Sequence, residues 1–297
     1  MRHPRTTAII IPTLNEASIT ATVDAVLAQS AAGPAPEVIV VGRDDAGRIR
    51  ARDGVRFVET ARPVYPGEAR NLGAAATDAE HLLFLDSDVV PAPGCIAALC
   101  RHLADHDCFA SGAVHLRPAP YWPLATNIAM LHEYLDHWPA APRPYLASLA
   151  FGVRHAAFDR TGGFEPTLRS AEDLDLFVRA RRLGYELHFE PAARVSHTQA
   201  IGSFGALYRK FRTYGAYSGL VRRRHRAELG GDGWLRRPGL LRLGAPAIAA
   251  AVTMRVFLRS PALLRFGHTA PVVFVSKLAW CLGAAESPDP EGRSGQS

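Results

Sequence analysis

The chain has 297 residues, 48% of them hydrophobic, so it can bury the core of one large domain and still carry an appendage. Its net charge of +6 is unevenly distributed: residues 207–297 hold 15 Arg and Lys against 5 Asp and Glu, whereas residues 1–206 hold 19 against 23. This distribution excludes a generally basic protein. It indicates instead a local anionic partner for the C-terminal third, such as a membrane surface.

Cysteine usage and the N-terminus bear on the cellular compartment. The four cysteines lack the C-x-x-C spacing of a metal site, and we expect them to be reduced thiols. The basic N-terminus passes directly into the apolar run Ala8–Ile11, and no apolar segment of signal-peptide length follows. The sequence therefore predicts a cytoplasmic protein, with the basic third as a candidate peripheral contact to the inner face of the cell membrane.

Apolar runs alternate with helical patterns over the first 90 residues. Short β-branched or apolar runs predict strands at residues 8–11, 37–41, 55–58 and 81–85. Helical spacing of apolar positions and an Ala-rich segment predict helices over residues 17–29 and 67–76. This βαβ rhythm predicts the α/β class, with a doubly wound, mostly parallel mixed sheet.

The pattern changes after Cys108. Strands or extended segments are predicted at residues 109–116, 146–153, 186–189 and 194–197, and helices at 122–138, 171–183 and 202–226. A Gly-rich linker is predicted at 230–239. Two apolar stretches follow, 243–254 and 270–285, each shorter than the roughly 18 apolar residues that a membrane span needs. We predict one domain over residues 1–206, a basic helical extension over 207–286 and a disordered tail over 287–297.

The strand over residues 81–85 ends in Asp86-Ser87-Asp88. Two carboxylates at the carboxyl end of a buried strand repel each other unless a cation or a bound ligand joins them. Ligands of open α/β sheets bind at that edge. A solvated turn also uses Asp and Ser, but it seldom follows five core residues. The pair therefore favours a site for Mg²⁺ or Mn²⁺, which prefer hard oxygen ligands.

Four other motifs are ambiguous when each is taken alone. Residues 12–16, P-T-L-N-E, could form a simple strand-to-helix turn, or a helix N-terminus that receives an anion. Arg70 could be a surface residue, or a cation that reaches toward phosphate or the aspartate pair. Glu172 and Asp173 are expected in a first helical turn from the helix dipole alone. His197 could merely end a strand.

In combination these motifs resemble glycosyltransferase family 2, whose members have the GT-A fold. The order is P-T-L-N-E, a strand ending in D-S-D, then G-G-F, A-E-D-L-D-L and a strand ending in His, from about Ala8 to about His197. The resemblance implies that residues 1–206 are a GT-A catalytic domain. It also implies transfer of a sugar from a nucleotide-sugar donor to a hydroxyl acceptor, with inversion and with Mg²⁺ or Mn²⁺ as the cofactor.

The resemblance also implies roles for individual residues. The general base would be Asp173, which would deprotonate the acceptor hydroxyl. The metal ligands would be Asp88 and His197. The nucleotide-sugar would be bound by Pro12, Thr13, Glu16, Asp44, Arg70, Asp86 and Ser87. The acceptor and the transferred sugar would be bound by Gly162, Gly163, Phe164 and Glu172.

One segment departs from the family pattern. The family usually ends its second strand with two aspartates, one of which reads the nucleobase. Here Val41 is followed by Gly42 and Arg43, and Asp44 and Asp45 come two residues later. Either a small bulge returns an aspartate to the base pocket, or the base is read differently. The donor could therefore be a UDP-, GDP- or dTDP-sugar.

The basic segments Tyr208–Arg212 and Arg222–Arg226 mix cations with aromatic residues on a predicted helix. A solvated charged face is the usual explanation. No recognised nucleic-acid module accompanies them, so we expect no nucleic-acid partner. The adjoining apolar stretches favour an interfacial membrane contact, with packing on the catalytic domain or a homodimer contact as alternatives. The acceptor could be lipid-linked, a glycan or a small molecule.

Two other functions remain to be weighed against the transferase. A sugar nucleotidyltransferase would carry a Gly-rich phosphate loop after the first strand, and P-T-L-N-E does not supply one. A non-catalytic nucleotide-sugar-binding or membrane-scaffold protein of the same fold would have lost the metal or base carboxylates. Asp86, Asp88 and Asp173 are all present.

Overall fold

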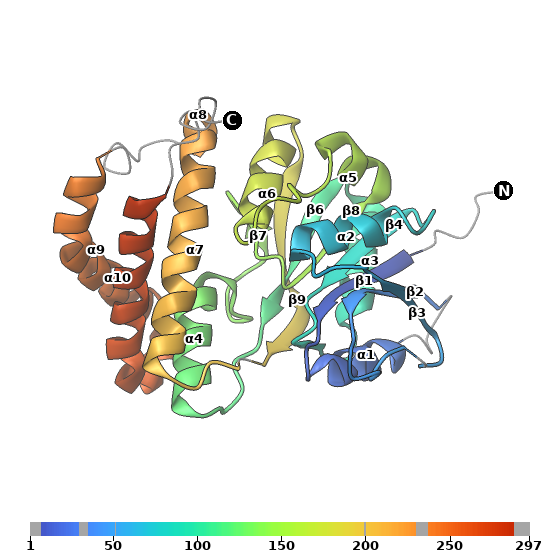
Figure 1. Ribbon diagram of the computed structural model, residues 1–297, viewed down its shortest axis with the longest axis horizontal. Helices are drawn as coiled ribbons and strands as arrows, with labels where there is room; N and C mark the ends of the chain where they lie inside the picture. The colour runs from blue at the N-terminus through green and yellow to red at the C-terminus, as the bar shows by residue number, and fades with distance from the viewer. Residues whose placement is uncertain (1–6, 30–34, 51, 199, 230–236, 288–297) are drawn as a thin grey trace. The chain divides into compact units, whose positions relative to one another are not determined.

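The computed structural model describes residues 7–29, 35–50, 52–198, 200–229 and 237–287, which belong to two compact units (Figure 1). The first unit is Met1–Leu116 with Glu133–Thr198, and the second is Arg117–His132 with Gln199–Ser297. The units thus divide near Thr198 rather than at residue 206, and a helix from the middle of the chain joins the second unit. Most of the predicted linker and nearly all of the predicted tail lie outside the described residues.

The first unit is built on a nine-stranded mixed sheet. Its strands are β1 (Thr7–Leu14), β2 (Glu37–Arg43), β3 (Val55–Glu59), β4 (His81–Leu85), β5 (Val89–Pro91), β6 (Cys108–Val114), β7 (Ala141–Pro142), β8 (Ala150–Arg154) and β9 (Glu186–His197). Their order is β3-β2-β1-β4-β8-β6-β9-β5, with β7 paired to β9 off this path. The first four strands are parallel neighbours, which confirms the predicted βαβ half, and β8 runs antiparallel to both β4 and β6.

Helices connect these strands and bury their apolar positions against the sheet. They are α1 (Ile19–Leu27), α2 (Pro66–Ala74), α3 (Cys95–Asp105), α5 (His155–Thr161) and α6 (Glu172–Arg182). Helix α1 buries Ile19, Val23 and Val26 at the predicted helical spacing. Helix α2 begins with a proline, a residue favoured at the first helical position. Helices α3 and α5 are additional to the predicted helices.

Four of the predicted elements have clearly different bounds in the structure. The two strands predicted at 186–189 and 194–197 are one strand, β9, because it continues through Pro191 with a register shift against β6 between Gly112 and Ala113. A strand tolerates a proline at a bulge, but both features interrupt the sequence pattern from which a strand is predicted. The strand predicted at 146–153 starts only at Ala150. The helix predicted at 122–138 ends at Leu131 and continues as a 3₁₀ turn, His132–Tyr134.

The second unit is helical, as predicted for the C-terminal extension. Its helices are α4 (Tyr121–Leu131), α7 (Phe204–Arg224), α8 (Arg226–Leu229), α9 (Pro238–Arg259) and α10 (Ala270–Glu286), with a 3₁₀ segment at Pro261–Thr269. Helix α10 packs against α7, α9 and α4. Leu241 and Ala245 of α9 form a buried cluster with Cys281, Ala284 and Ala285 of α10. Helix α9 extends past the predicted apolar stretch at both ends, and by length and composition it could cross a membrane.

Gly42 of β2 lies opposite Thr13 of β1, close to its main chain. Its φ is +134°, and a Cβ there would lie 1.9 Å from the carbonyl oxygen of Thr13, its partner in the β1–β2 register. We expect Gly42→Ala to lower the free energy of unfolding by more than about 3 kcal/mol, because both backbone strain and a clash with main chain must be relieved. Urea denaturation of the purified protein measures this loss.

Gly47→Ala is the matched control for this substitution. Gly47 has a φ of +67°, but a Cβ there meets nothing within 4 Å. The control variant isolates the cost of the left-handed conformation, about 1 kcal/mol. Equal losses for the two variants would contradict the close approach at Gly42.

Candidate active site

Three parallel strands bring predicted site residues to one edge of the sheet. The β1–β4 register pairs Ile10 with Phe84, and two further residues along both strands place Pro12 opposite Asp86. The aspartate loop is fixed by its backbone: Asp86 N–H donates to Leu149 O at 3.0 Å, and the Thr22 hydroxyl donates to Ser87 O at 2.9 Å. The carboxylates predicted from the end of β4 therefore project from a rigid turn between β4 and β5.

Arg70 of α2 joins two of the predicted carboxylates. It is 2% exposed, and its guanidinium donates to Asp86 Oδ1 at 2.5 Å and to Glu172 Oε1 at 2.8 Å. The guanidinium also lies over the Phe164 ring, 5.1 Å from the centroid. These contacts connect segments up to 102 residues apart. Arg70 therefore holds the first turn of α6 beside the end of β4.

The electrostatics of this network follow from burial and paired charges. Burial alone would lower the pKa of Arg70, but the charges of Asp86 and Glu172 outweigh it and the pKa is raised. Burial raises the pKa of Asp86, and the charge of Asp88 adds to this, while Arg70 opposes both. The guanidinium is therefore permanently charged, and the two aspartates destabilise each other.

Asp88 and His197 form the second part of the site. Val89 of β5 pairs with His197 of β9, so the loop aspartate and the strand-end histidine are neighbours, with His197 Nε2 3.1 Å from Asp88 Oδ2. The His197 side chain is 4% exposed and that of Asp88 30% exposed.

This donor pair fits a divalent cation. Two ligands bound at about 2.1 Å and at right angles lie about 3 Å apart, which matches the separation between His197 Nε2 and Asp88 Oδ2. A carboxylate with an imidazole suits Mn²⁺ as well as other first-row ions. The partial exposure of Asp88 leaves room for non-protein ligands such as phosphate oxygens and water.

Asp173 is the second residue of helix α6 and follows Glu172, a partner of Arg70. Its Oδ1 accepts the N–H of Leu174 at 2.7 Å, and the preceding Ala171 is held in the left-handed region at φ +62°. Burial raises the pKa of Asp173 to about 7, the charge of Glu172 adds to this, and bonds from Leu174 and Ser148 oppose it. A carboxylate with a pKa near neutrality is suited to accept a proton from a hydroxyl.

The glycine loop before α6 is locked by two residues that were not among the predicted site residues. Asn71 donates to Phe164 O at 2.8 Å and accepts from Phe164 N at 2.9 Å, and Arg179 donates to Gly163 O at 2.7 Å. Gly162 and Gly163 both have positive φ, and a Cβ on Gly163 would lie 2.8 Å from Asn71 Oδ1. Asn71 follows Arg70 directly, but its partner is 93 residues away, so no local pattern could identify it.

The side chains of two residues predicted to bind the acceptor, Phe164 and Glu172, make contacts within the protein. Phe164 is 1% exposed, and its ring packs against Phe84, Phe151 and Phe158. Its side chain therefore supports Arg70, and its contact with an acceptor stays a prediction. Glu172 is 7% exposed and is bound to Arg70, so its carboxylate is a structural partner of the guanidinium. Gly162 is exposed and Gly163 is buried, which leaves the loop backbone as the accessible part of this segment.

Thr13 near the end of β1 and Glu16 just after this strand differ in what their side chains contact. Thr13 is 6% exposed, and its hydroxyl has no hydrogen-bond partner among the described residues. Thr60, which follows β3, has the same property. Glu16 instead accepts from Ser18 N at 3.0 Å and from the Ser18 hydroxyl at 2.8 Å, next to the start of α1. Because buried polar atoms are nearly always satisfied, the two threonines mark positions where a ligand can supply a partner.

The aspartates after β2 do not both face a ligand edge. Asp44 is 3% exposed, and its carboxylate accepts the N–H of Ile49 at 2.7 Å, so it stabilises its own turn. The Asp44 oxygen bound to Ile49 therefore has a structural role, and the nucleotide contact of Asp44 stays a prediction. Asp45 is more exposed and bonds to Arg43 and to Asn15, whose φ is +59°. The Asn15–Asp45 pair ties the end of β1 to the segment after β2.

Comparisons with known proteins show which family the chain resembles. The model of a family described as "Glycosyl transferase family 2" matches residues 8–172. Proteins from two strains of Mycobacterium tuberculosis, each called "Pre-mycofactocin glycosyltransferase", are 37% identical over 141 residues. The aligned part is 44% of this chain and 30% of those proteins, so the match spans less than a third of the length of these curated relatives.

Two solved structures resemble the whole fold. The mannosyltransferase PcManGT from Pyrobaculum calidifontis, in complex with GDP-Man and Mn²⁺, has a TM-score of 0.62 at 19% identity and covers 96% of this chain and 86% of its own. GalNAc-T7 with UDP, GalNAc and Mn²⁺ has a TM-score of 0.54 at 18% identity, covering 78% and 53%. Such identities show the fold alone. The family match, by contrast, spans more than half of the chain, and the protein therefore belongs to glycosyl transferase family 2, with the GT-A fold.

Proposed function

We propose that this enzyme transfers a sugar from a nucleotide-sugar to a hydroxyl acceptor with inversion at the anomeric carbon, assisted by Mg²⁺ or Mn²⁺. The observation that carries the proposal is the Arg70 bridge, which places the Asp173 end of α6 beside the aspartate turn of β4. A base and a metal-ligating turn on one sheet edge are the two parts that a single displacement requires. The nucleotides and Mn²⁺ bound by the two structural neighbours support the same interpretation.

The roles of the side chains follow from their positions. Asp173 accepts the proton of the acceptor hydroxyl as the oxygen attacks the anomeric carbon, and the nucleoside diphosphate leaves from the opposite side. Asp88 and His197 would hold the divalent cation, which would neutralise charge on the departing diphosphate. Arg70 is a positioning residue for Asp86 and Glu172. Because one displacement occurs, the configuration at the anomeric carbon inverts.

The nucleoside half of the donor is assigned to the ends of β1 and β3. The unpartnered hydroxyls of Thr13 and Thr60 supply donors and acceptors there. The structural role of Asp44 leaves the choice among UDP, GDP and dTDP open.

Isothermal titration calorimetry with UDP, GDP and dTDP in Mn²⁺ tests the proposal. We expect one of the three to bind at least about tenfold more tightly than the others, since bases are discriminated by hydrogen bonds to polar groups. EDTA should weaken that binding. Binding of none of them, or binding that EDTA leaves unchanged, would contradict a metal-assisted nucleotide-sugar site.

Calorimetry of the Thr13→Val variant tests whether Thr13 contributes to nucleotide binding. The variant removes a hydroxyl that has no hydrogen-bond partner among the described residues, so the apparent melting temperature should not fall. If the nucleotide bonds to this hydroxyl, the dissociation constant should rise by about tenfold. Unchanged nucleotide affinity would remove Thr13 from the donor site.

We also propose that α9 lies on an anionic membrane surface and that the acceptor is lipid-linked. One face of α9 is buried through Leu241, Ala245 and Ala249, as an amphipathic helix requires. The opposite face is apolar too: Leu243 is 81% exposed, Met254 59% and Leu258 69%. A helix that is apolar all round is normally buried in protein or lipid.

Basic residues around α9 favour lipid as the occupant of its exposed face. The exposed arginines are Arg242, Arg255, Arg259 and Arg265. Arginine side chains beside a shallowly inserted apolar face bind anionic headgroups, each contributing about 1 kcal/mol near the surface. A second copy of the chain would not account for this charge. Peripheral attachment at the cytoplasmic leaflet is the corresponding location.

Flotation of the full chain with vesicles containing phosphatidylserine tests this attachment. We expect Leu243→Glu/Leu258→Glu to abolish flotation, because each carboxylate would enter the apolar layer. Leu183→Glu is the matched control, since Leu183 is 45% exposed in the first unit. Equal flotation of both variants, or a shift from dimer to monomer for the α9 variant alone, would favour a homodimer contact instead.

A further inference from the structure

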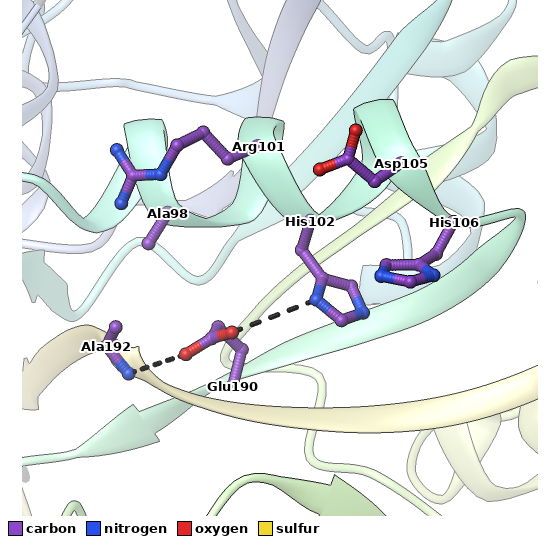
Figure 2. A pocket seen from close by; sticks show the side chains of 7 residues that line it. All are labelled: Ala98, Arg101, His102, Asp105, His106, Glu190 and Ala192. Atoms are coloured by element: carbon purple, nitrogen blue, oxygen red, sulfur yellow. Dashed lines mark hydrogen bonds and ion pairs between the residues drawn. The ribbon is translucent and has the colours of Figure 1, made fainter.

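A cluster of histidines and a glutamate lies between helix α3 and strand β9, away from the proposed catalytic residues. His102 and His106 are four residues apart on α3 and so share one helix face. His188 and Glu190 are two residues apart on β9 and so share one face of the sheet. Helix α3 packs on β9, which brings the two pairs together. Figure 2 shows His102 and Glu190 pointing toward each other. Both line an open pocket of about 270 Å³.

We propose that His102, His188 and Glu190 bind a first-row transition-metal ion, with Zn²⁺ as the best match. One donor atom from each residue lies within 4.8 Å of the other two. Tetrahedral ligands bound at about 2.0–2.1 Å lie about 3.4 Å apart, so small side-chain rotations would complete the geometry. Two imidazoles and one carboxylate are a donor set that zinc prefers, with water in the fourth position.

Neighbouring groups orient the side chains of the cluster, whereas Glu190 and His102 do not hydrogen-bond to each other. The Glu190 Oε1 oxygen accepts Ala192 N–H at 2.9 Å, which fixes the carboxylate, while its Oε2 is 3.8 Å from His102 Nδ1 and thus beyond hydrogen-bond distance. His188 Nδ1 faces Glu186 at 3.4 Å, which makes Nε2 its candidate ligand atom. Such outer carboxylates orient metal-bound histidines in known sites.

The histidine rings of the cluster lie against each other, and like charges on such close rings would repel. The ring centroids of His102 and His188 are 4.0 Å apart and those of His102 and His106 are 4.7 Å apart. Burial lowers the pKa of His102, and the neighbouring His188 and His106 lower it further. A bound ion would tie α3 to β9, whose last residue is His197.

Calorimetric titration of Zn²⁺ into the EDTA-treated full chain tests the site. We expect His102→Gln to weaken zinc binding by at least about tenfold, as loss of one of three ligands requires. His115→Gln is the matched control. His115 also pairs with a carboxylate, Asp136, at 2.7 Å, but it is not one of the three residues of the proposed metal site. This control should change the zinc affinity less than about twofold.

A second pair of measurements separates this site from the proposed catalytic one. Asp88→Ala should leave the His102-dependent zinc binding intact, and zinc should raise the melting temperature of the Asp88→Ala variant but not of a His102→Gln/Asp88→Ala variant. If the metal-free His102→Gln protein does not fold, Glu190→Gln takes its place. Equal zinc affinity in the wild type and in these ligand variants would overturn the proposal.

Discussion

Asp173→Asn is expected to lower kcat by about 10³-fold while the donor nucleotide binds with nearly unchanged affinity. The amide has the shape of the carboxylate and can still accept the Leu174 N–H, but it cannot take a proton from the acceptor. Steady-state kinetics with a matched donor, together with calorimetry of the nucleoside diphosphate, measure the two effects separately. Unchanged turnover would refute Asp173 as the base.

Asp159→Asn is the control for this substitution. It makes the same chemical change on α5, at a side chain that is 71% exposed, and it should retain wild-type turnover. The pH profile gives a further test, because a pKa of about 7 means that Asp173 is protonated and inactive in acid. We expect log(kcat/KM) to rise with unit slope below about pH 7 and to level off above it.

The raised pKa of Asp173 also predicts a cost in stability. Burial shifts the pKa of this carboxyl upward, so the folded state binds the proton more tightly than the unfolded state between the ordinary aspartate pKa of 3.8 and about 7. The folded form therefore loses stability as pH rises through that window, and the loss is complete above it. Asp173→Asn removes the charge, so at pH 8 the variant should be more stable than the wild type, by an amount on the order of a few kcal/mol. A catalytic residue that destabilises its own fold would behave in this way, whereas a structural carboxylate would not.

Strand-end chemistry could be predicted from the sequence because it depends on local patterns. The run of five core residues before Asp86 and the polar ends of β1 and β9 needed no distant information. The bridge by Arg70 could not be predicted in the same way, because its partners lie 16 and 102 residues away. The direction in which Phe164 points was equally hidden, since a Gly-Gly-Phe loop suits both a ligand contact and a core anchor.

Two other features depended on tertiary context. Asp44 accepts the N–H of Ile49, but in the sequence it looks no different from a solvent-facing aspartate directly after a strand. The exposed leucines of α9 could be recognised only when the buried face of the helix was known, because the apolar residues occur on all sides. Composition placed the basic surplus in the correct third of the chain, but it could not say which helix face remained uncovered.

Asp88→Ala is expected to remove the metal dependence of nucleoside diphosphate binding. The wild type should bind about 10- to 100-fold more tightly in Mn²⁺ than in EDTA, and the variant should bind equally in both, as calorimetry would measure. His197 would remain, but one imidazole alone cannot hold a hard cation against water. Because the buried His197 loses its 3.1 Å partner in Asp88→Ala, the isosteric Asp88→Asn serves as a second variant with the same expected loss.

Asp86→Asn separates the roles of the two aspartates in the same measurement. Asp86 is bound to Arg70, so its neutralisation should disturb the position of α6 and lower kcat, yet leave the difference between Mn²⁺ and EDTA largely in place. Metal dependence that survives in both Asp88 variants would place the cation elsewhere. Loss of the metal dependence in Asp86→Asn alone would mean that Asp86 holds the cation. The contact between Arg70 and Asp86 would then belong to the metal-free state.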